Sequence, residues 1–253
     1  NPYIFVRRAY IDIAGRVPTY QEWKTFIRRP DRKKLIEDLQ NSKGYTESMF
    51  NFYADLLRIK RRLSNNIDGD TYISWVKQEI ENNTPYDEFI KKILTAQGNI
   101  WENPEVGYFL RDEGMLLDNV SNTFQAFAGM NISCAQCHDH PFDDWTQMDY
   151  YNMTAFFTQL NTRGNKEDRK EFQRLRKEAE ELDKSGKEKG STNRIGQFYR
   201  HGYQHTIVQD QDKKLKLPDD YKYRDAEPGE VVKAETAVGD RVKERRKREG
   251  LRD

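Results

Sequence analysis

Apolar residues in the first 160 positions recur with the period of an α-helix, and this pattern constrains the fold more than any other feature of the sequence. Val6, Ala9 and Tyr10, for example, have the i, i+3, i+4 spacing that places side chains on one helical face. Neither Asn-Gly turns nor sustained apolar–polar alternation, the signals of β-hairpins, occurs. We therefore expect a mainly α-helical fold with a bundle-like core. The stripes predict helices over residues 6–13, 49–56, 72–80, 89–94, 117–128 and 150–160.

Capping residues add boundaries and shorter helices to this pattern. Thr19 and Glu22 have the capping-box spacing, in which each side chain accepts a backbone N–H at a helix start. Residues 31–42 predict another short helix, and Pro85 stands where the helix over 89–94 can begin.

Residues 163–189, the charged segment, differ from the rest because 18 of these 27 residues are charged. Their few apolar residues are spaced 3, 4 and 3 positions apart, which predicts a narrow apolar seam along a charged helix. We expect a solvated helical arm inserted into the domain, with partner docking along the seam or plain disorder as the alternatives. The seam consists of Phe172, Leu175, Ala179 and Leu182.

The chain beyond the charged segment reads as a loop-rich, slightly β tail. Residues 186–193 are expected to form a flexible loop, and residues 196–210 and 214–225 are short, β-leaning stretches. We expect one domain over residues 1–240. The basic residues 241–253 are expected to be a solvated helix or the edge of a downstream domain.

Composition excludes two classes of partner. The net charge of +1 provides no overall field for nucleic acid or an anionic membrane surface. No run of about 18 apolar residues exists, so no transmembrane helix is expected.

Cys134, Cys137 and His138 form the pattern C-x-x-C-H, which is the attachment pattern of c-type haem. Two thiols about one turn apart can form thioethers with the two vinyl groups of a haem, and the following imidazole can bind the iron on its proximal side. The two cysteines are the only ones in the chain. The pattern therefore predicts one covalent haem c, with the nearby aromatic residues either lining it or forming ordinary core.

Three other interpretations of the motif remain open. A zinc site could use Cys134, Cys137, His138 and His140, although zinc ligands usually include a pair from a distant segment. A redox dithiol is the second, although such a pair usually follows a strand in an α/β fold. A chance match is the third.

The remaining iron position has several candidates. His205 ranks first, because the adjoining apolar residues 206–208 should dock it firmly against the core, and Met148 ranks second. An open or water-bound iron is the further possibility, and it would favour an enzyme. Weaker candidates are Met130, Met153 and His201.

Three residues just after the motif are expected to support it without binding iron. Asp139, His140 and Asp143 lie on the proximal side, where they can hydrogen-bond the local turn or a haem propionate.

The stretch GMNISCAQCHDHPFDDWTQMDYYNMTAFF, residues 129–157, resembles the signature of the domain of unknown function that accompanies planctomycete-type cytochrome c modules. Residues 5–27, 53–59, 74–98 and 217–232 also resemble that family, whereas the charged segment looks like an insertion. The resemblance implies an exported bacterial protein with its haem on Cys134, Cys137 and His138. The family usually has a charged residue at position 148, which speaks against Met148 as an iron ligand.

Electron transfer is the expected function, with a redox protein or a neighbouring cytochrome module as partner. Covalent haem attachment takes place outside the cytoplasmic membrane, so the motif predicts a periplasmic or cell-surface location. One alternative is a haem enzyme of the peroxidase or oxidase type with an open distal site. The other is a non-catalytic assembly module with a structural haem, docking through residues 163–189.

Overall fold

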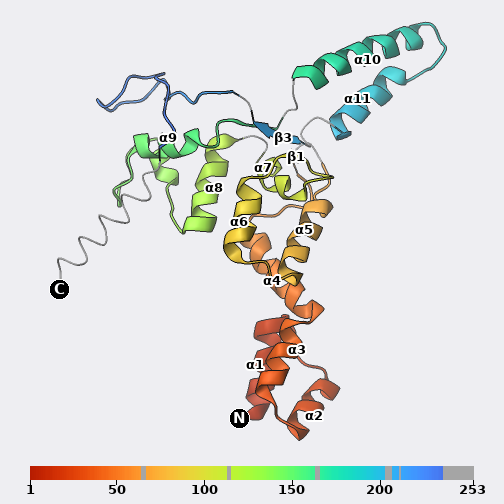
Figure 1. Cartoon of the computed structure of the whole chain (residues 1–253), viewed down its shortest axis with the longest axis vertical. Helices are drawn as coiled ribbons and strands as arrows, with labels where there is room; N and C mark the ends of the chain where they lie inside the picture. Colours follow the sequence, from red (N-terminus) through yellow and green to blue (C-terminus); the bar gives the residue numbers. More distant parts are fainter. Residues whose placement is uncertain (64–66, 113–114, 163–165, 203–206, 211, 236–253) are drawn as a thin grey trace. The chain divides into compact units, whose positions relative to one another are not determined.

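The computed structural model describes residues 1–235 except 64–66, 113–114, 163–165, 203–206 and 211, and its helices are labelled in chain order in Figure 1. The chain groups into two compact units. The first contains residues 1–62 and 68–96, and the second contains residues 63–67 and the chain from residue 97 onward. The expected single domain over 1–240 stays a prediction, and the basic residues 241–253 lie outside the described part.

The first unit is helical throughout and confirms the periodicity. Its helices begin and end at capping residues: Thr19 and Glu22 form the predicted capping box, and Gly15 ends the first helix with a φ of 65° that favours glycine. The helices are α1 (Pro2–Ala14), α2 (Tyr20–Arg28), α3 (Arg32–Gln40), α4 (Lys43–Leu56), α5 (Asp70–Glu81) and α6 (Tyr86–Leu94).

The predicted stripe on α1 forms the core of the N-terminal helices. Val6, Ala9 and Tyr10 are buried together with Phe26 of α2 and Leu39 of α3. Burial of these apolar side chains is what holds three short, highly charged helices together, because helices of about ten residues are marginal alone.

The second unit holds the motif and confirms a mainly α class with little strand. Its three short strands form an antiparallel sheet in the order β1-β3-β2, in which Gly98 pairs with Val208 and Leu160 pairs with Asp210. The elements are β1 (Gly98–Asn99), η2 (Pro104–Val106), α7 (Gly107–Leu110), α8 (Leu116–Ala128), η3 (Ser133–Gln136), α9 (Gln147–Ala155), β2 (Leu160–Asn161), α10 (Lys166–Lys184), α11 (Ser191–Gly202) and β3 (Ile207–Asp210). No helix in the described part is both long and apolar enough to cross a membrane.

The charged segment forms a helix, as predicted, but it is half of a helical hairpin (Figure 1). Residues 191–202, expected as loop and β-leaning chain, instead form α11, which packs along α10. Ala179 of the seam is buried, and the ring of Phe172 stacks on Tyr199 with centroids 3.9 Å apart. The seam is thus covered in part from within the chain, while Leu182 at its end stays exposed, and docking of a partner through 163–189 stays a prediction.

The carboxylate of Asp183 joins the two helices of the hairpin. Its oxygens accept hydrogen bonds from the backbone N–H of Ser191 at 3.0 Å and from the backbone N–H and hydroxyl of Thr192 at 3.0 and 2.6 Å. The hydroxyl and N–H of Thr192 are the main reasons why the pKa of Asp183 falls from 3.8 to about 2. This contact explains why α11 escaped prediction, because its N-terminus is capped from a distant residue.

The start of α11 should therefore depend on pH. A carboxyl group whose pKa is lower in the folded chain stabilises it above about pH 4, and that contribution is lost as the pH falls towards 2. We expect the protection of the Ser191 and Thr192 amides, which is the intrinsic exchange rate divided by the observed rate, to fall over this range in the native protein and to be low at all pH values in Asp183→Ala. Hydrogen exchange followed by NMR measures both. Equal protection in the two proteins at neutral pH would contradict the cap.

Candidate functional site

The C-x-x-C-H motif forms a short helical turn that is separate from the preceding helix α8. The predicted helix over 117–128 is present as α8, which ends at Ala128, where Gly129 adopts a φ of 65°. The backbone N–H of Met130 then bonds the carbonyl of Phe124 at 3.1 Å, which closes the helix end. The chain turns here and forms the 3-10 helix η3, with Cys137 as its C-cap.

The two thiols share one side of this turn. The backbone N–H of Cys137 bonds the carbonyl of Cys134 at 3.3 Å, and side chains three residues apart lie one above the other in a 3-10 helix. Both cysteines are free and exposed, while Ala135 between them is fully buried. The turn is thus anchored by its alanine and offers both sulfur atoms to the same reagent.

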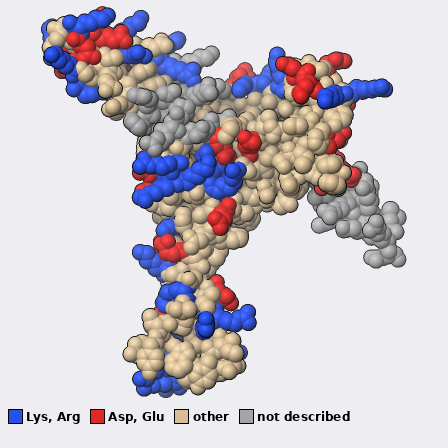
Figure 2. Space-filling view, turned by 180° about the vertical axis from the view of Figure 1, so that it is seen from behind, with Lys and Arg blue, Asp and Glu red and all other residues tan. Residues whose placement is uncertain are grey.

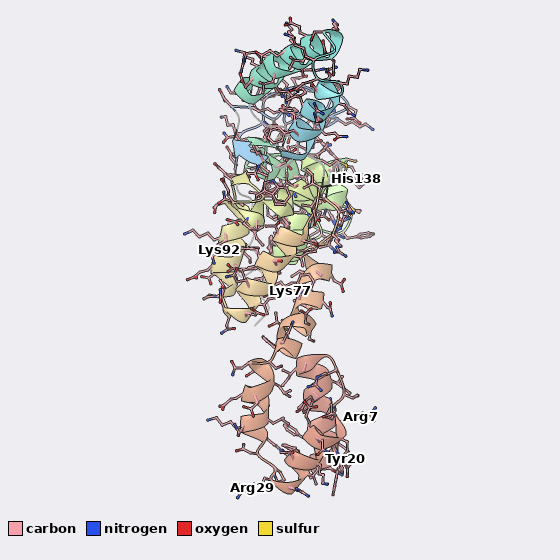
Figure 3. All side chains as sticks on the ribbon, turned by 90° about the vertical axis from the view of Figure 1, so that its right-hand side faces the viewer. Arg7, Tyr20, Arg29, Lys77, Lys92 and His138 are labelled. Atoms are coloured by element: carbon pink, nitrogen blue, oxygen red, sulfur yellow. The ribbon has the colours of Figure 1, made fainter. Side chains whose placement is uncertain are left out.

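His138, labelled in Figure 3, is exposed and hydrogen-bonded to its own loop. Its Nδ1 lies 2.7 Å from the backbone carbonyl oxygen of Asp139. A carbonyl oxygen only accepts, so Nδ1 carries a proton, and in the neutral ring Nε2 then keeps its lone pair. This is the tautomer that a metal ligand binding through Nε2 requires.

Asp139 links the motif to two other segments. Its backbone N–H donates to the Tyr223 hydroxyl at 2.7 Å, and its Oδ1 accepts from the backbone N–H of Gln147 at 2.9 Å. Gln147 is buried, and its side-chain amide donates to the carbonyl of Gln136 at 3.1 Å. The start of α9 and the C-terminal segment, residues 212–235, therefore both hold the motif. Sequence reasoning missed Gln147 and Tyr223, and Tyr223 lies 84 positions away from its partner.

His140 and Asp143 shape the loop that follows. The backbone N–H of His140 bonds the carbonyl of Trp145 at 2.7 Å, and its Nδ1 accepts from the backbone N–H of Phe142 at 3.2 Å. Asp143 accepts from the next backbone N–H, that of Asp144, at 2.8 Å. These are the turn contacts expected of the two residues, and their action on a propionate stays a prediction.

The motif is not arranged as a site for a bare metal ion. Among the described residues, no three His, Cys, Asp or Glu side chains are grouped so that they could hold one. A zinc site on Cys134, Cys137, His138 and His140 needs such a grouping. Haem attachment does not, because the cysteines bond to carbon and the histidine alone meets the iron. The two thiols and the imidazole of this turn are groups that haem attachment could use, and the zinc interpretation stays a prediction.

The aromatic residues near the motif mostly form protein core. Trp145, Tyr150 and Tyr151 are at most 5% exposed and pack with Ala135. The hydroxyl of Tyr150 donates to the carbonyl of Leu117 at 2.7 Å, and burial raises its pKa to about 12. Burial also raises the pKa of Tyr151, as does the nearby Cys137 thiol. The same cluster includes Ile132, Met153, Leu217, Tyr221 and Val232.

Phe142 and Phe156 are exceptions, because they are 94% and 52% exposed. Both were among the aromatic residues that could line a haem. The ring of Phe142 lies 6.5 Å from that of His140, so its exposed surface adds apolar area close to the motif.

The described candidates for the second axial ligand, three methionines, belong to or pack against the core cluster that includes Ala135 of the motif. Met153 is buried, and Met130 and Met148 pack against the same core cluster. His205 lies outside the described residues, and so does the side chain of His201. The distal ligand therefore stays a prediction.

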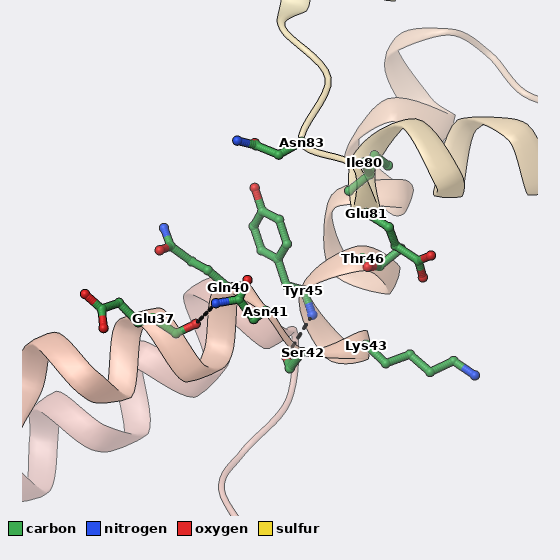
Figure 4. A pocket seen from close by; sticks show the side chains of 10 residues that line it. All are labelled: Glu37, Gln40, Asn41, Ser42, Lys43, Tyr45, Thr46, Ile80, Glu81 and Asn83. Atoms are coloured by element: carbon green, nitrogen blue, oxygen red, sulfur yellow. Dashed lines mark hydrogen bonds between the residues drawn. The ribbon is translucent and has the colours of Figure 1, made fainter.

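A second candidate site is a polar groove of about 600 Å³ within the first unit (Figure 4). It lies where α3 ends, α4 begins and α5 ends, and it holds neither thiols nor histidines. Its lining includes the amides of Gln40, Asn41 and Asn83, the Tyr45 ring, and the carboxylates of Glu37 and Glu81. These groups can exchange hydrogen bonds with a polar molecule, but none has redox chemistry.

Charged side chains are unevenly spread over the surface. Figure 2 shows several Lys and Arg side chains close together near the middle of the face in view, with Asp and Glu side chains scattered around a large uncharged area. On α10 the charged side chains form ion pairs from Arg174 to Glu171 and Glu178. Such exposed pairs contribute little to stability, and they keep this surface solvated.

Comparison with known proteins gives one match. A family model described as PSCyt2, protein of unknown function (DUF1549), matches residues 1–162. The match includes the motif and ends before α10, so the helical hairpin and the C-terminal segment lie outside it. No curated protein and no solved structure matches the chain.

Proposed function

The chain belongs to the PSCyt2 family of proteins of unknown function (DUF1549), and we propose that it is a c-type cytochrome domain that carries one covalent haem and transfers electrons. One observation carries the proposal. The C-x-x-C-H turn presents two free, exposed thiols on one side, followed by an imidazole whose Nε2 lone pair is available. That set of groups is the one that covalent haem attachment requires, and no second set of this kind occurs among the described residues.

Three residues would hold the group. The thiols of Cys134 and Cys137 would each add across a vinyl group, forming a C–S bond while the hydrogen goes to the other vinyl carbon. His138 would bind the iron through Nε2. The haem supplies a one-electron couple between ferric and ferrous iron.

The protein's own part is to hold these groups still and accessible. Ala135 anchors the turn in the core, and the hydrogen bonds through Asp139 and Gln147 fix the loop after it. A rigid mount lowers the reorganisation that accompanies each change of charge. Exposure of the motif lets a redox protein or a neighbouring cytochrome module come close, and we propose that the chain works in the periplasm or at the cell surface.

The alternative function, a haem enzyme with an open distal site, is favoured by the methionines. Met130, Met148 and Met153 all belong to the core or pack against it, so they are poor candidates for the second axial ligand. An iron without that ligand exchanges small molecules. Carbon monoxide and cyanide titrations separate the two functions: unchanged spectra favour electron transfer, and saturable binding favours the enzyme.

The test of the main proposal is covalent haem. When the chain is exported with a cytochrome c maturation system, we expect one haem per chain that remains with the protein in acid acetone. The mass should increase by that of one haem, and the iron should cycle between two redox states. A haem that is extracted by acid acetone, or a stoichiometric zinc in elemental analysis, would refute it.

A further inference from the structure

Tyr223 reaches the motif from the far end of the described chain. Its hydroxyl accepts the backbone N–H of Asp139 at 2.7 Å, directly after His138. The carbonyl of the same Asp139 accepts the Nδ1–H of His138, also at 2.7 Å. The backbone of one residue thus connects the tyrosine to the imidazole. We propose that Tyr223 is a positioning residue, which fixes Asp139 so that its carbonyl holds His138 with a free Nε2.

The C-terminal segment is built to hold Tyr223 firmly. The backbone N–H of Leu217 bonds the carbonyl of Glu230 at 2.9 Å, and that of Val232 bonds the carbonyl of Leu215 at 2.9 Å. These bonds close the segment into a loop. Leu217 and Val232 are buried in the same core cluster as Ala135 of the motif. The loop and the motif therefore share one core, and the position of one constrains the other.

The ring of Tyr223 is fixed as well. It packs partly buried against this core cluster, edge to face with Tyr221 at a centroid distance of 5.6 Å. A ring held by packing has little rotamer freedom left to lose, so its hydroxyl makes a directed hydrogen bond at low entropic cost. The Tyr223 hydroxyl therefore fixes the Asp139 backbone better than a hydroxyl on a mobile surface side chain would.

Asp139 is held from two sides as a result. The Gln147 N–H fixes its carboxylate, and Tyr223 fixes its backbone. The N–H and the carbonyl of Asp139 belong to different peptide units, so the effect of Tyr223 on His138 is geometric. It sets the direction of the carbonyl, and the carbonyl selects the imidazole tautomer.

A matched pair of variants isolates the hydroxyl. Tyr223→Phe keeps the ring and removes the bond to Asp139. Tyr221→Phe is the control, because Tyr221 lies in the same loop and cluster but donates its hydroxyl to Asp225 at 2.7 Å. Each change removes one hydroxyl and leaves the packing alone. Circular dichroism of both variants checks that they fold.

The first measurement uses the full chain without haem, labelled with 15N. The wild type should show a protonated Nδ1 and an unprotonated Nε2 on neutral His138. Tyr223→Phe should mix the two tautomers, and the exchange rate of the Asp139 amide should rise about five- to tenfold. Tyr221→Phe should change neither quantity. Unchanged spectra in Tyr223→Phe, or equal changes in both variants, would overturn the role.

The second measurement uses the haem-loaded protein and rests on the proposed function. Tyr223→Phe should shift the reduction potential, whereas Tyr221→Phe should leave it within error of the wild type. Equal potentials in all three proteins would overturn the effect of Tyr223 on the iron. Failure of the wild type to bind haem would sink the proposed function, but it would leave the tautomer and exchange results as the test of Tyr223.

Discussion

Replacing Cys134 and Cys137 together by serine is expected to abolish covalent haem entirely while leaving the fold intact. Thioethers need thiols, and the chain has no other cysteine. Both side chains are exposed, and no part of the core depends on them. The free energy of unfolding of the haem-free protein should therefore change by less than about 0.5 kcal/mol.

Single replacements sharpen this prediction. Cys134→Ser and Cys137→Ser should each keep one thioether, and the pyridine haemochrome spectrum reports how many vinyl groups remain. Ser133→Ala is the control, because Ser133 is an exposed neighbour in the same turn that bonds only Asn131 among the contacts described. It should retain a full complement of haem. Covalent haem in the double variant, or equal loss in Ser133→Ala, would contradict the assignment.

The helices could be predicted wherever the information is local. The stripe on α1, the capping box at Thr19 and the helical character of the charged segment are all confirmed. In each case the residues that decide the structure lie within one or two turns of each other. A single sequence contains all that is needed for such a prediction.

The elements that escaped prediction depend on distant partners. Strands β1 and β2 are two residues long and have no periodicity to detect, whereas β3 (Ile207–Asp210) lies within the stretch 196–210 that was predicted as β-leaning. The helix α11 is capped by Asp183 and packed on Phe172, both from α10. Ile195, Phe198 and Tyr199 have the i, i+3, i+4 spacing of a helical face, but Gly196 and Gly202 within the segment and Gly190 before it weaken this local signal.

The candidate site likewise has features that could be predicted from local sequence and features that depend on distant contacts. The spacing of Cys134, Cys137 and His138 suggests its chemistry because thioether attachment requires neighbours in sequence. The role of the aromatic residues could not be predicted, because aromatic side chains on one helical face have the same spacing whether they line a cofactor or pack in the protein core. Packing decides: Trp145 is buried, and Phe142 is exposed. The contact of Tyr223 with Asp139 has no sequence signature at all.

Replacing Asp112 by alanine is expected to cause the largest loss of stability in the second unit. Arg111 and Asp112 form an ion pair whose side chains are 1% and 7% exposed. The carboxylate accepts from Arg111 Nε at 3.0 Å and from the Asn119 amide at 2.9 Å. The Arg111 guanidinium also lies 4.5 Å from the centroid of the Tyr108 ring. Removal of Asp112 leaves a positive charge buried between α7 and α8 without its carboxylate.

Breaking a buried ion pair of this kind costs about 3–5 kcal/mol. Native-state hydrogen exchange of the α8 amides measures this cost within the second unit alone. The comparison is Glu180→Gln, which removes the partner of Arg176 in a pair of 3.2 Å whose side chains are 56% and 41% exposed. That change should cost less than about 1 kcal/mol, because water solvates both charges. If Asp112→Ala lowered the unfolding free energy by no more than Glu180→Gln does, the idea that burial makes the Arg111–Asp112 pair important for stability would be wrong. The helix α8 leads through Gly129 into the motif. The stability lost in Asp112→Ala should therefore also lower the yield of haem-loaded protein, although Asp112 itself is not proposed to bind haem.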